Sequence, residues 1–367
     1  MKILYDHQIF TSQKYGGISR YFYELVRELD NISEVEYEIP LLVSNNHYIS
    51  DKRFVDYIEL LPNKQFRGKH RIFKLINKPN NIWKLKQQKF DIFHPTYYDP
   101  YFLKYLGNKP FVLTVYDMIH EKFSDMFSST DKTTEQKRLL VEKATKIIAI
   151  SESTKKDLIE LFGTDESKIE VVYLGNSMFP KTDIKLDFEI PKKYLLFVGG
   201  RGSYKNFERF IKSVSQLLTQ NKELFVLCTG GGKFSSSEIQ LFNELEISKQ
   251  VLQYNLDDDS LAYFYKNALA FIFPSLYEGF GIPVLESFAC GCPLLCSNVS
   301  SLPEVAGDAA CYFDPYSEES IKNAVSRVLN DSNFREELIN KGYEQLKEFS
   351  WKKTAEETKK IYESVLI

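Results

Sequence analysis

The stretch SLYEGFGIPVLE, residues 275–286, carries two glutamates eight positions apart, Glu278 and Glu286, with a glycine-rich turn between them. The apolar run 270–274 precedes it, so the pattern predicts a strand, a loop and then a helix that begins near Pro283. Glycines let backbone N–H groups approach an anion at a helix N-terminus, where the helix dipole also favours negative charge. A carboxylate on each side of the turn can accept hydrogen bonds from sugar hydroxyls. Together these features indicate a pocket for a phosphorylated sugar.

This stretch, followed by Cys290-Gly291-Cys292-Pro293, closely resembles the glutamate-x7-glutamate signature of the retaining GT-B glycosyltransferases of family 4. The resemblance extends over nearly the whole chain and includes the early double glycine, Gly16-Gly17, the pair Arg201 and Lys205, and the terminal helix. It implies an α/β chain of GT-B architecture, with two facing Rossmann-like domains, parallel sheets and a ligand in the interdomain cleft. The implied reaction transfers a hexose from a nucleotide-diphosphate sugar, GDP- or UDP-linked, to a sugar or lipid-linked glycan acceptor. Bacterial surface polysaccharide synthesis, of O-antigen or capsule, is the implied setting.

Bulk composition fits a two-domain globular protein. The chain has 367 residues, and single cores rarely grow past about 250–300 residues. Hydrophobic content of 43% and charged content of 26% are ordinary, and a net charge of −3 gives no reason to expect nucleic-acid binding. No apolar run reaches the roughly 18–20 residues of a membrane span, and residues 1–6 are typical of a strand rather than a signal peptide. We therefore expect a cytoplasmic protein, on the inner face of the cell membrane if it binds lipid.

The arrangement of cysteines and acidic residues does not favour a metal site. The five cysteines all lie after residue 227, and the C-x-C-x3-C pattern at 290–296 has no second ligand pair, since all five histidines lie in the other half of the chain. Asp257-Asp258-Asp259 resembles the manganese-binding motif of the other large glycosyltransferase fold, but it directly precedes a helical pattern and is expected to be a cap. Gly230-Gly231-Gly232-Lys233 lacks P-loop spacing and is expected to close a strand. We expect no metal and no cofactor beyond the donor substrate.

Short apolar runs alternate with amphipathic helical patterns, which predicts parallel sheets with crossover helices. The expected boundaries are an N-terminal acceptor-binding domain over 1–178, a linker over 179–192 and a C-terminal nucleotide-sugar-binding domain over 193–350. The family pattern implies that helix 351–367 packs back on the first domain. The predicted strands are 2–5, 37–43, 92–94, 111–115, 147–150, 169–172, 194–198, 224–228, 251–254, 270–273, 293–296 and 310–313.

Arg201 and Lys205 follow the first predicted strand of the second domain and lead into a helix. They place two positive charges where a diphosphate must bind. The guanidinium of Arg201 offers forked hydrogen-bond donors, and the ammonium of Lys205 is a point charge. By resemblance, they neutralise the pyrophosphate leaving group, whose charge grows in the transition state. The alternative is a solvated basic loop.

The roles of the two glutamates come from the resemblance. Glu286 would accept hydrogen bonds from the ribose, and Glu278 would hold hydroxyls of the donor sugar rather than act as a covalent nucleophile. The structural alternatives are a helix N-terminal charge for Glu286 and a turn residue for Glu278. Contacts to phosphate or sugar are expected from the backbone of Gly279, Phe280, Gly281 and Ile282.

In the first domain, Gly16 and Gly17 precede a helix and are expected to let amides approach phosphate or the reacting sugar, although a plain tight turn also uses glycine. The chain departs from the family pattern at Tyr116-Asp117, where many relatives carry His-Asp. Either Tyr116 replaces that histidine, or His120 reaches the same space. We place Asp117 and His120 near the site, with a structural role as the alternative for each; His7 and His94 are weaker candidates.

Residues 51–90 form a basic, aromatic segment with eleven Lys or Arg against three Asp or Glu, a local charge of +8. Such a segment suits an anionic membrane surface. A solvated helical face packed by its aromatics is the alternative.

Two other functions stay open from the sequence. A nucleotide-sugar 2-epimerase shares the two-domain architecture, and a non-catalytic subunit that binds sugar nucleotide is the reading that the Tyr116 departure supports.

Overall fold

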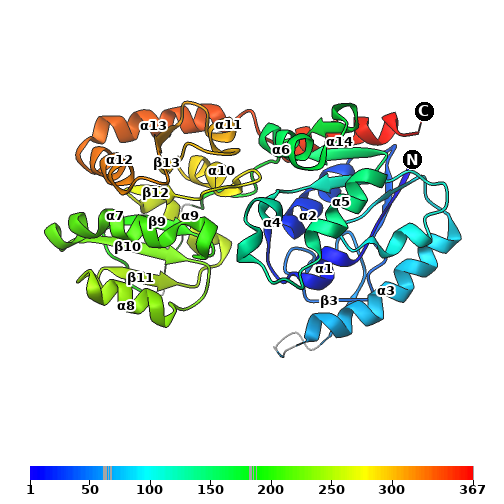
Figure 1. Cartoon of the computed structure of the whole chain (residues 1–367), viewed down its shortest axis with the longest axis horizontal. Helices are drawn as coiled ribbons and strands as arrows, with labels where there is room; N and C mark the ends of the chain where they lie inside the picture. The colour runs from blue at the N-terminus through cyan, green and yellow to red at the C-terminus, as the bar shows by residue number, and fades with distance from the viewer. Residues whose placement is uncertain are drawn as a thin grey trace. The chain divides into compact units, whose positions relative to one another are not determined.

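The computed structural model describes residues 1–60, 64, 66, 68–181, 184, 186 and 188–366, and these form two compact units (Figure 1). Unit 1 comprises Met1–Leu174 and Ser350–Ile367, and unit 2 comprises Gly175–Phe349. Parts of the predicted linker 179–192 and of the basic segment 51–90, and the last residue of the predicted helix 351–367, lie outside the described residues. The described linker residues carry no helix or strand and belong to unit 2.

Unit 2 contains one parallel sheet of six strands, in the order β11-β10-β9-β12-β13-β14. The first strand of the unit, β9, pairs with β10 on one side and with β12 on the other, where Ala270 lies opposite Leu195. In chain order the strands therefore run 3-2-1-4-5-6, the order of a Rossmann fold, which reverses between β9 and β12. The strands are β9 Lys193–Val198, β10 Leu224–Thr229, β11 Val251–Tyr254, β12 Ala270–Phe273, β13 Leu294–Ser297 and β14 Ala310–Phe313.

Helices cover this sheet because its central strands are apolar on both faces. All four residues of β12 are buried, as expected for a strand that helices cover on both sides. The first helix, α7, buries Phe207, Phe210, Val214 and Leu218 at helical spacing against the sheet. The helices are α7 Phe207–Gln220, α8 Ser236–Glu244, α9 Asp258–Asn267, α10 Ile282–Ala289, α11 Leu302–Ala306, α12 Glu318–Asn330 and α13 Ser332–Leu346.

Unit 1 is also built from parallel strands, in the orders β2-β1-β5 and β6-β7-β8, and a bridge between Phe93 and Phe111 joins the two sets. These strands are β1 Lys2–Tyr5, β2 Glu36–Glu38, β5 Ile92–His94, β6 Val112–Val115, β7 Lys146–Ala149 and β8 Ile169–Val171. The helices of this unit are α1 Gln8–Ser12, α2 Gly17–Leu29, α3 Lys69–Gln87, α4 Ile119–Lys122, α5 Thr133–Lys143, α6 Glu152–Phe162 and α14 Trp351–Ser364.

The last helix, α14, belongs to unit 1, where it contacts α2. The Tyr362 hydroxyl lies 2.9 Å from the Tyr5 hydroxyl and 2.6 Å from His94 Nδ1, both buried. Thr354 donates a hydrogen bond to the carbonyl of Tyr173 at 2.7 Å. These bonds tie α14 to β1, to β5 and to the segment that follows β8.

The single predicted strand over 37–43 is wrong. The chain leaves the main sheet after β2, and β3, Val43–Ser44, pairs instead with β4, Ile58–Glu59, in a separate two-stranded sheet. Pro40 between them has no N–H to donate. Its carbonyl accepts a hydrogen bond from Asn81 Nδ2 of α3 at 2.7 Å, so a helix takes the place of a neighbouring strand.

Candidate functional site

The candidate site lies where the strand order of unit 2 reverses, between β9 and β12. In open parallel sheets, ligands bind outside the carboxyl ends of the strands at such a point. The loops that leave these two strands contact each other, since the amide of Leu276 donates to the carbonyl of Tyr204 at 2.7 Å. Segments that are about seventy residues apart in sequence therefore form one local structure.

Lys205 and Glu278 form an ion pair between these two loops. Lys205 Nζ lies 2.6 Å from Glu278 Oε1, and their side chains are 20% and 11% exposed. The Glu278 amide donates to Ser300 Oγ at 3.0 Å, and Ser301 Oγ donates to the Glu278 carbonyl at 2.9 Å. Two residues of the loop before α11 thus hold the backbone of the glutamate in place. The structure brings together one cation and one anion of the predicted site.

The start of α10 requires glycine and leaves its N-terminus without a side-chain cap. Gly281 precedes the helix at φ +101°, a conformation that L residues rarely adopt, and an added Cβ would lie 2.9 Å from Leu302 Cδ2. No side chain caps this end, and Pro283 stands in the first turn, where its missing N–H costs nothing. Phe280 is buried edge-on to Phe349, and its carbonyl accepts a hydrogen bond from Ser301 Oγ at 3.0 Å. The sequence predicts that Gly279 and Ile282 contact a ligand through their backbones. A helix N-terminus such as that of α10 is suited to an anion.

Glu286 lies one turn into α10 and is only 6% exposed. Its Oε2 accepts a hydrogen bond from the Tyr265 hydroxyl at 3.2 Å. Burial, and then the charge of Glu286, raises the pKa of Tyr265 well above its ordinary value, so the hydroxyl stays a donor. The sequence does not reveal Tyr265 as the partner, because it lies on another helix, α9.

Arg201 is bound to the loop after β10, unlike Lys205. Its Nε donates to Glu238 Oε1 at 2.6 Å, and its Nη atoms donate to three carbonyls, those of Gly230 at 2.9 Å and of Gly232 and Lys233 at 3.0 Å each. The guanidinium side chain is 5% exposed. It lines a polar cavity of about 640 Å³ between the start of α7 and α8. The two cations that the sequence pairs therefore engage different partners.

The glycine run 230–232 closes β10, as the sequence predicts, and also makes room for Arg201. All three glycines have positive φ, and a Cβ on Gly231 would lie 2.9 Å from Arg201 Nη1. Glu238, which the sequence reasoning missed, completes the arrangement. It forms a capping box with Ser235 at the start of α8. Burial raises the pKa of Glu238, but hydrogen bonds from Arg201 and Ser235 outweigh burial and hold the pKa below its ordinary value.

In unit 1, Gly17 is the first residue of α2, and Gly16 precedes it. A Cβ on Gly16 would lie 2.3 Å from Gln13 Oε1, which accepts a hydrogen bond from the Ser19 amide at 3.3 Å. A glutamine side chain thus takes up an amide of the first turn of α2, and Gly16 makes space for it. Sequence reasoning missed Gln13, since it precedes the usual cap position.

Tyr116 and Asp117 follow β6 and are both engaged. The Tyr116 hydroxyl is buried and donates to the Thr96 carbonyl at 3.2 Å. Asp117 Oδ1 accepts from the Ile119 amide at 3.0 Å. The buried Lys137 donates to the Asp117 carbonyl and lies 4.0 Å from its carboxylate.

The His120 side chain contacts Phe127 and Asp131 rather than Asp117. Its ring stacks on Phe127 with centroids 3.9 Å apart, and its Nε2 lies 3.8 Å from Asp131 Oδ2. Within the part of the chain that the structure describes, the side chains of His120 and Asp117 form no hydrogen bond or ion pair with each other.

The two weaker histidine candidates are buried. His94 bridges Tyr362 and Thr114, whose Oγ1 lies 2.9 Å from Nε2, and burial lowers the pKa of His94 to about 3. A neutral imidazole there serves as a structural joint. Burial also lowers the pKa of His7, whose Nδ1 lies 3.0 Å from Thr11 Oγ1.

The remaining motifs have structural roles in unit 2. Asp257 accepts a hydrogen bond from the Ser260 amide at 2.8 Å and caps α9. All five cysteines are buried free thiols, and burial raises the pKa of Cys290 to about 12. Within the described residues, no cluster of His, Cys, Asp or Glu could hold a metal ion. In the same part of the chain, no helix combines the length and apolar character needed to cross a membrane.

Two family models match the chain, Glycosyltransferase Family 4 over residues 15–176 and Glycosyl transferases group 1 over residues 179–345. The O-antigen chain mannosyltransferase B of Escherichia coli is 27% identical over 376 residues, covering 94% of this chain and 95% of that protein. Sucrose-phosphate synthase from Thermosynechococcus elongatus has a similar structure, with a TM-score of 0.75 at 18% identity, covering 99% of this chain and 98% of that one. HepE of Anabaena, solved in complex with UDP and glucose, gives a TM-score of 0.74 at 15% identity and covers 99% and 100%.

Proposed function

Since the chain belongs to the family 4 glycosyltransferases and has their GT-B fold, we propose that it transfers a hexose from a nucleotide-diphosphate sugar to a glycan acceptor with retention of configuration. It is a glycosyltransferase of polysaccharide synthesis. Mannose is the first hexose to test, because the relative from Escherichia coli is named an O-antigen chain mannosyltransferase. We further propose that the acceptor is lipid-linked and that the enzyme works at the inner face of the cell membrane.

The Lys205–Glu278 pair at the strand reversal is the observation that carries this proposal. In our mechanism the ammonium of Lys205 binds the diphosphate and stabilises the charge that grows as the glycosidic bond breaks. Glu278 accepts hydrogen bonds from hydroxyls of the sugar that this diphosphate carries. A cation for the leaving group and an anion for the sugar must lie next to each other, and 2.6 Å between their charged atoms meets that requirement.

Glu286 and the start of α10 would bind the rest of the donor. The carboxylate of Glu286, held by Tyr265, accepts hydrogen bonds from the ribose hydroxyls. Amides at the uncapped N-terminus of α10 contact phosphate oxygens, where the helix dipole adds to the attraction. In this proposal unit 2 supplies the donor contacts.

Arg201 has a different role from Lys205 in this mechanism. A guanidinium has five N–H donors, and Glu238 and three carbonyls take most of those of Arg201. We propose that Arg201 orders the loop after β10 and adds positive charge to the site. Lys205 makes the direct contact with phosphate.

In the first domain we propose acceptor contacts near Asp117 and His120, with Gly16 and Gly17 close to the reacting sugar. Because the Tyr116 hydroxyl is bonded to a backbone carbonyl, we assign Tyr116 a packing role and His120 the proton-handling role. Imidazole side chains are common general acids and bases in enzymes.

Two measurements test the proposal. Thermal stability is first recorded with GDP-, UDP-, ADP- and dTDP-sugars, since a bound ligand at a hundredfold excess over Kd stabilises by about 2.7 kcal/mol. The sugar that stabilises most is then incubated with glycan acceptors, and the anomeric configuration of the product is read by NMR. A product of inverted configuration refutes the retaining assignment. An epimerised sugar formed without acceptor identifies an epimerase, and binding without turnover identifies a silent subunit.

A further inference from the structure

Helix α3 packs on the rest of unit 1 through a face of mixed polar and apolar side chains. The buried positions recur every four residues and include Phe73, Asn77, Asn81 and Leu85. Asn77 Oδ1 accepts from the amides of Leu42 and Val43 at 2.9 and 3.0 Å, and Asn81 donates to the Pro40 carbonyl. The helix is held against the segment 40–43 largely by asparagine side chains.

The opposite face of α3 exposes large apolar side chains among basic ones, whereas a surface helix usually turns polar and charged residues to solvent. Leu75 is 75% exposed, Trp83 55% and Ile72 43%, and Pro79 is also exposed. A contiguous exposed apolar patch rimmed by polar residues is typical of an interaction site. Exposure of these apolar side chains to water is unfavourable, and a binding partner that covered them would remove this free-energy penalty.

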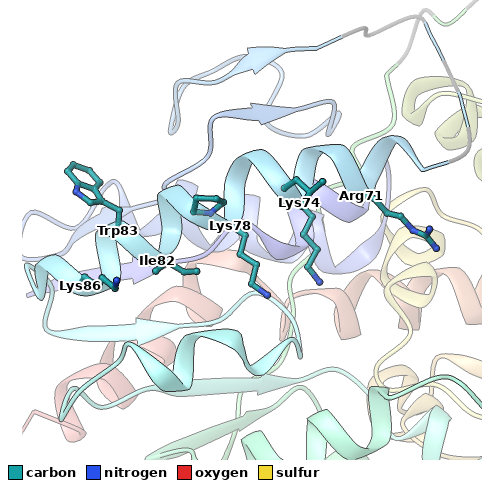
Figure 2. Close-up of a pocket in the computed structure, with 8 residues that line it drawn as sticks. Arg71, Lys74, Lys78, Ile82, Trp83 and Lys86 are labelled. Atoms are coloured by element: carbon teal, nitrogen blue, oxygen red, sulfur yellow. The ribbon is translucent and has the colours of Figure 1, made fainter.

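A groove of about 770 Å³ runs along this face (Figure 2). All of the residues that line the groove come from α3, and four of them are basic. We call the eight lining residues together the outer stripe: Arg71, Lys74, Leu75, Lys78, Pro79, Ile82, Trp83 and Lys86.

The outer stripe carries a net positive charge. Lys74 Nζ and Lys78 Nζ lie 2.7 and 3.5 Å from the same carboxylate, that of Asp99. Among the described residues, no carboxylate lies within 4.0 Å of Arg71 or Lys86. Four cations and one anion leave three positive charges beside the apolar residues.

We propose that the outer stripe of α3 is the surface through which this protein lies on an anionic lipid bilayer. Leucine, isoleucine and tryptophan side chains enter the boundary between headgroups and acyl chains, while the long basic side chains reach the anionic headgroups. The charge argues against a second copy as the occupant, because a two-fold contact would bring the same three positive charges together. The proposal rests on the proposed function in one respect: a lipid-linked acceptor places the enzyme at a bilayer.

The test uses the full chain with vesicles of phosphatidylcholine alone and of phosphatidylcholine mixed with phosphatidylglycerol. We expect flotation only with phosphatidylglycerol vesicles and release by salt. The chain has two tryptophans, and Trp351 is buried, so a blue shift of the emission on binding reports on Trp83. No binding to phosphatidylglycerol vesicles, or equal binding to both vesicle types, overturns the proposal.

Matched variants locate the surface. Arg71→Gln with Lys86→Gln removes two charges of the stripe and should weaken vesicle binding roughly 30-fold. The control, Lys156→Gln with Lys352→Gln, changes the net charge equally at side chains that are 74% and 79% exposed elsewhere on unit 1, and should bind like wild type. Leu75→Ser should also weaken binding, whereas Phe179→Ser, at a residue 74% exposed, should not.

Other outcomes redirect or reject the assignment. If the stripe variants and the control variants weaken vesicle binding equally, the protein is attracted by its overall charge without a defined surface, and the proposal is refuted. A dimer that Leu75→Ser dissociates assigns the stripe to a second copy, and binding to polyglutamate but not to vesicles assigns it to an acidic protein. Transfer to a water-soluble acceptor without vesicle binding rejects this proposal alone, and vesicle binding without transfer rejects the proposed function alone.

Discussion

Lys205→Met tests whether the ion pair at the strand reversal serves catalysis or only stability. The two charged atoms are 2.6 Å apart, and the side chains are 20% and 11% exposed. A surface ion pair contributes at most about 1 kcal/mol, and breaking a fully buried one costs about 3–5 kcal/mol. For this partly buried pair we expect about 2–3 kcal/mol of destabilisation, because Glu278 is left without its cation. In a unit of this size that lowers Tm by roughly 4–12 °C.

The double variant Lys205→Met, Glu278→Gln separates the two roles. Removing both charges leaves no buried ion without a partner, so we expect stability to return to within about 1 kcal/mol of wild type. Activity should not return, because the leaving-group contact is still absent. We expect kcat/KM for donor transfer to stay about 10²–10³-fold below wild type in both variants.

The assay combines calorimetric Tm values with steady-state transfer rates, and Lys212→Met on α7, whose lysine pairs with Glu208 at an exposed site, is the matched control. Recovery of activity together with stability in the double variant would show that the pair is only structural. A Lys205→Met enzyme that keeps kcat/KM within about threefold of wild type would refute the leaving-group role directly.

Three further predictions concern single positions. Gly281→Ala should destabilise unit 2 by about 2 kcal/mol, because of its φ of +101° and the close approach to Leu302; thermal unfolding measures this, with Gly200→Ala as a control that meets no atom within 4 Å. Tyr265→Phe removes the donor to Glu286 and should raise KM for the donor about tenfold with little change in kcat; an unchanged KM would contradict the ribose role. The pKa of His94 falls from its ordinary value of 6.5 to about 3 in the folded state, so the unfolded chain binds the extra proton between these values and stability falls as pH falls below 6.5. In urea unfolding, the free energy of unfolding of His94→Gln should fall less steeply with decreasing pH than that of wild type, by up to about 1.4 kcal/mol per pH unit. Equal pH slopes for the two proteins would be evidence against this.

Much of the fold follows from local pattern. Strands 251–254, 270–273 and 310–313 are predicted to the residue, because short, largely apolar runs between turn signals have few alternatives. The strand over 37–43 fails for a tertiary reason. Asparagine side chains of α3, more than thirty residues away, satisfy the backbone that a neighbouring strand would otherwise pair with.

The sequence places the acidic and glycine residues of the candidate site in one short stretch, but it does not identify the side chains that hold them. Glu278, Gly281 and Glu286 belong to one short stretch, whose spacing implies a strand, a turn and a helix. The placement of Arg201 depends on Glu238, which lies on a separate helix and has no motif that links the two. Gln13 was missed for the same reason, since its contact with the start of α2 depends on the path of the loop.

The return of α14 to unit 1 has a consequence for biosynthesis. Tyr5 and Tyr362, whose hydroxyls are hydrogen-bonded in the folded protein, are 357 positions apart, so unit 1 cannot complete its packing until α14 has been translated. Unit 2 is a continuous insertion with no such requirement. Unit 2 can therefore fold on the ribosome while unit 1 still exposes the surface that α14 will cover. A truncation immediately before α14 would leave unit 2 intact and unit 1 incompletely packed.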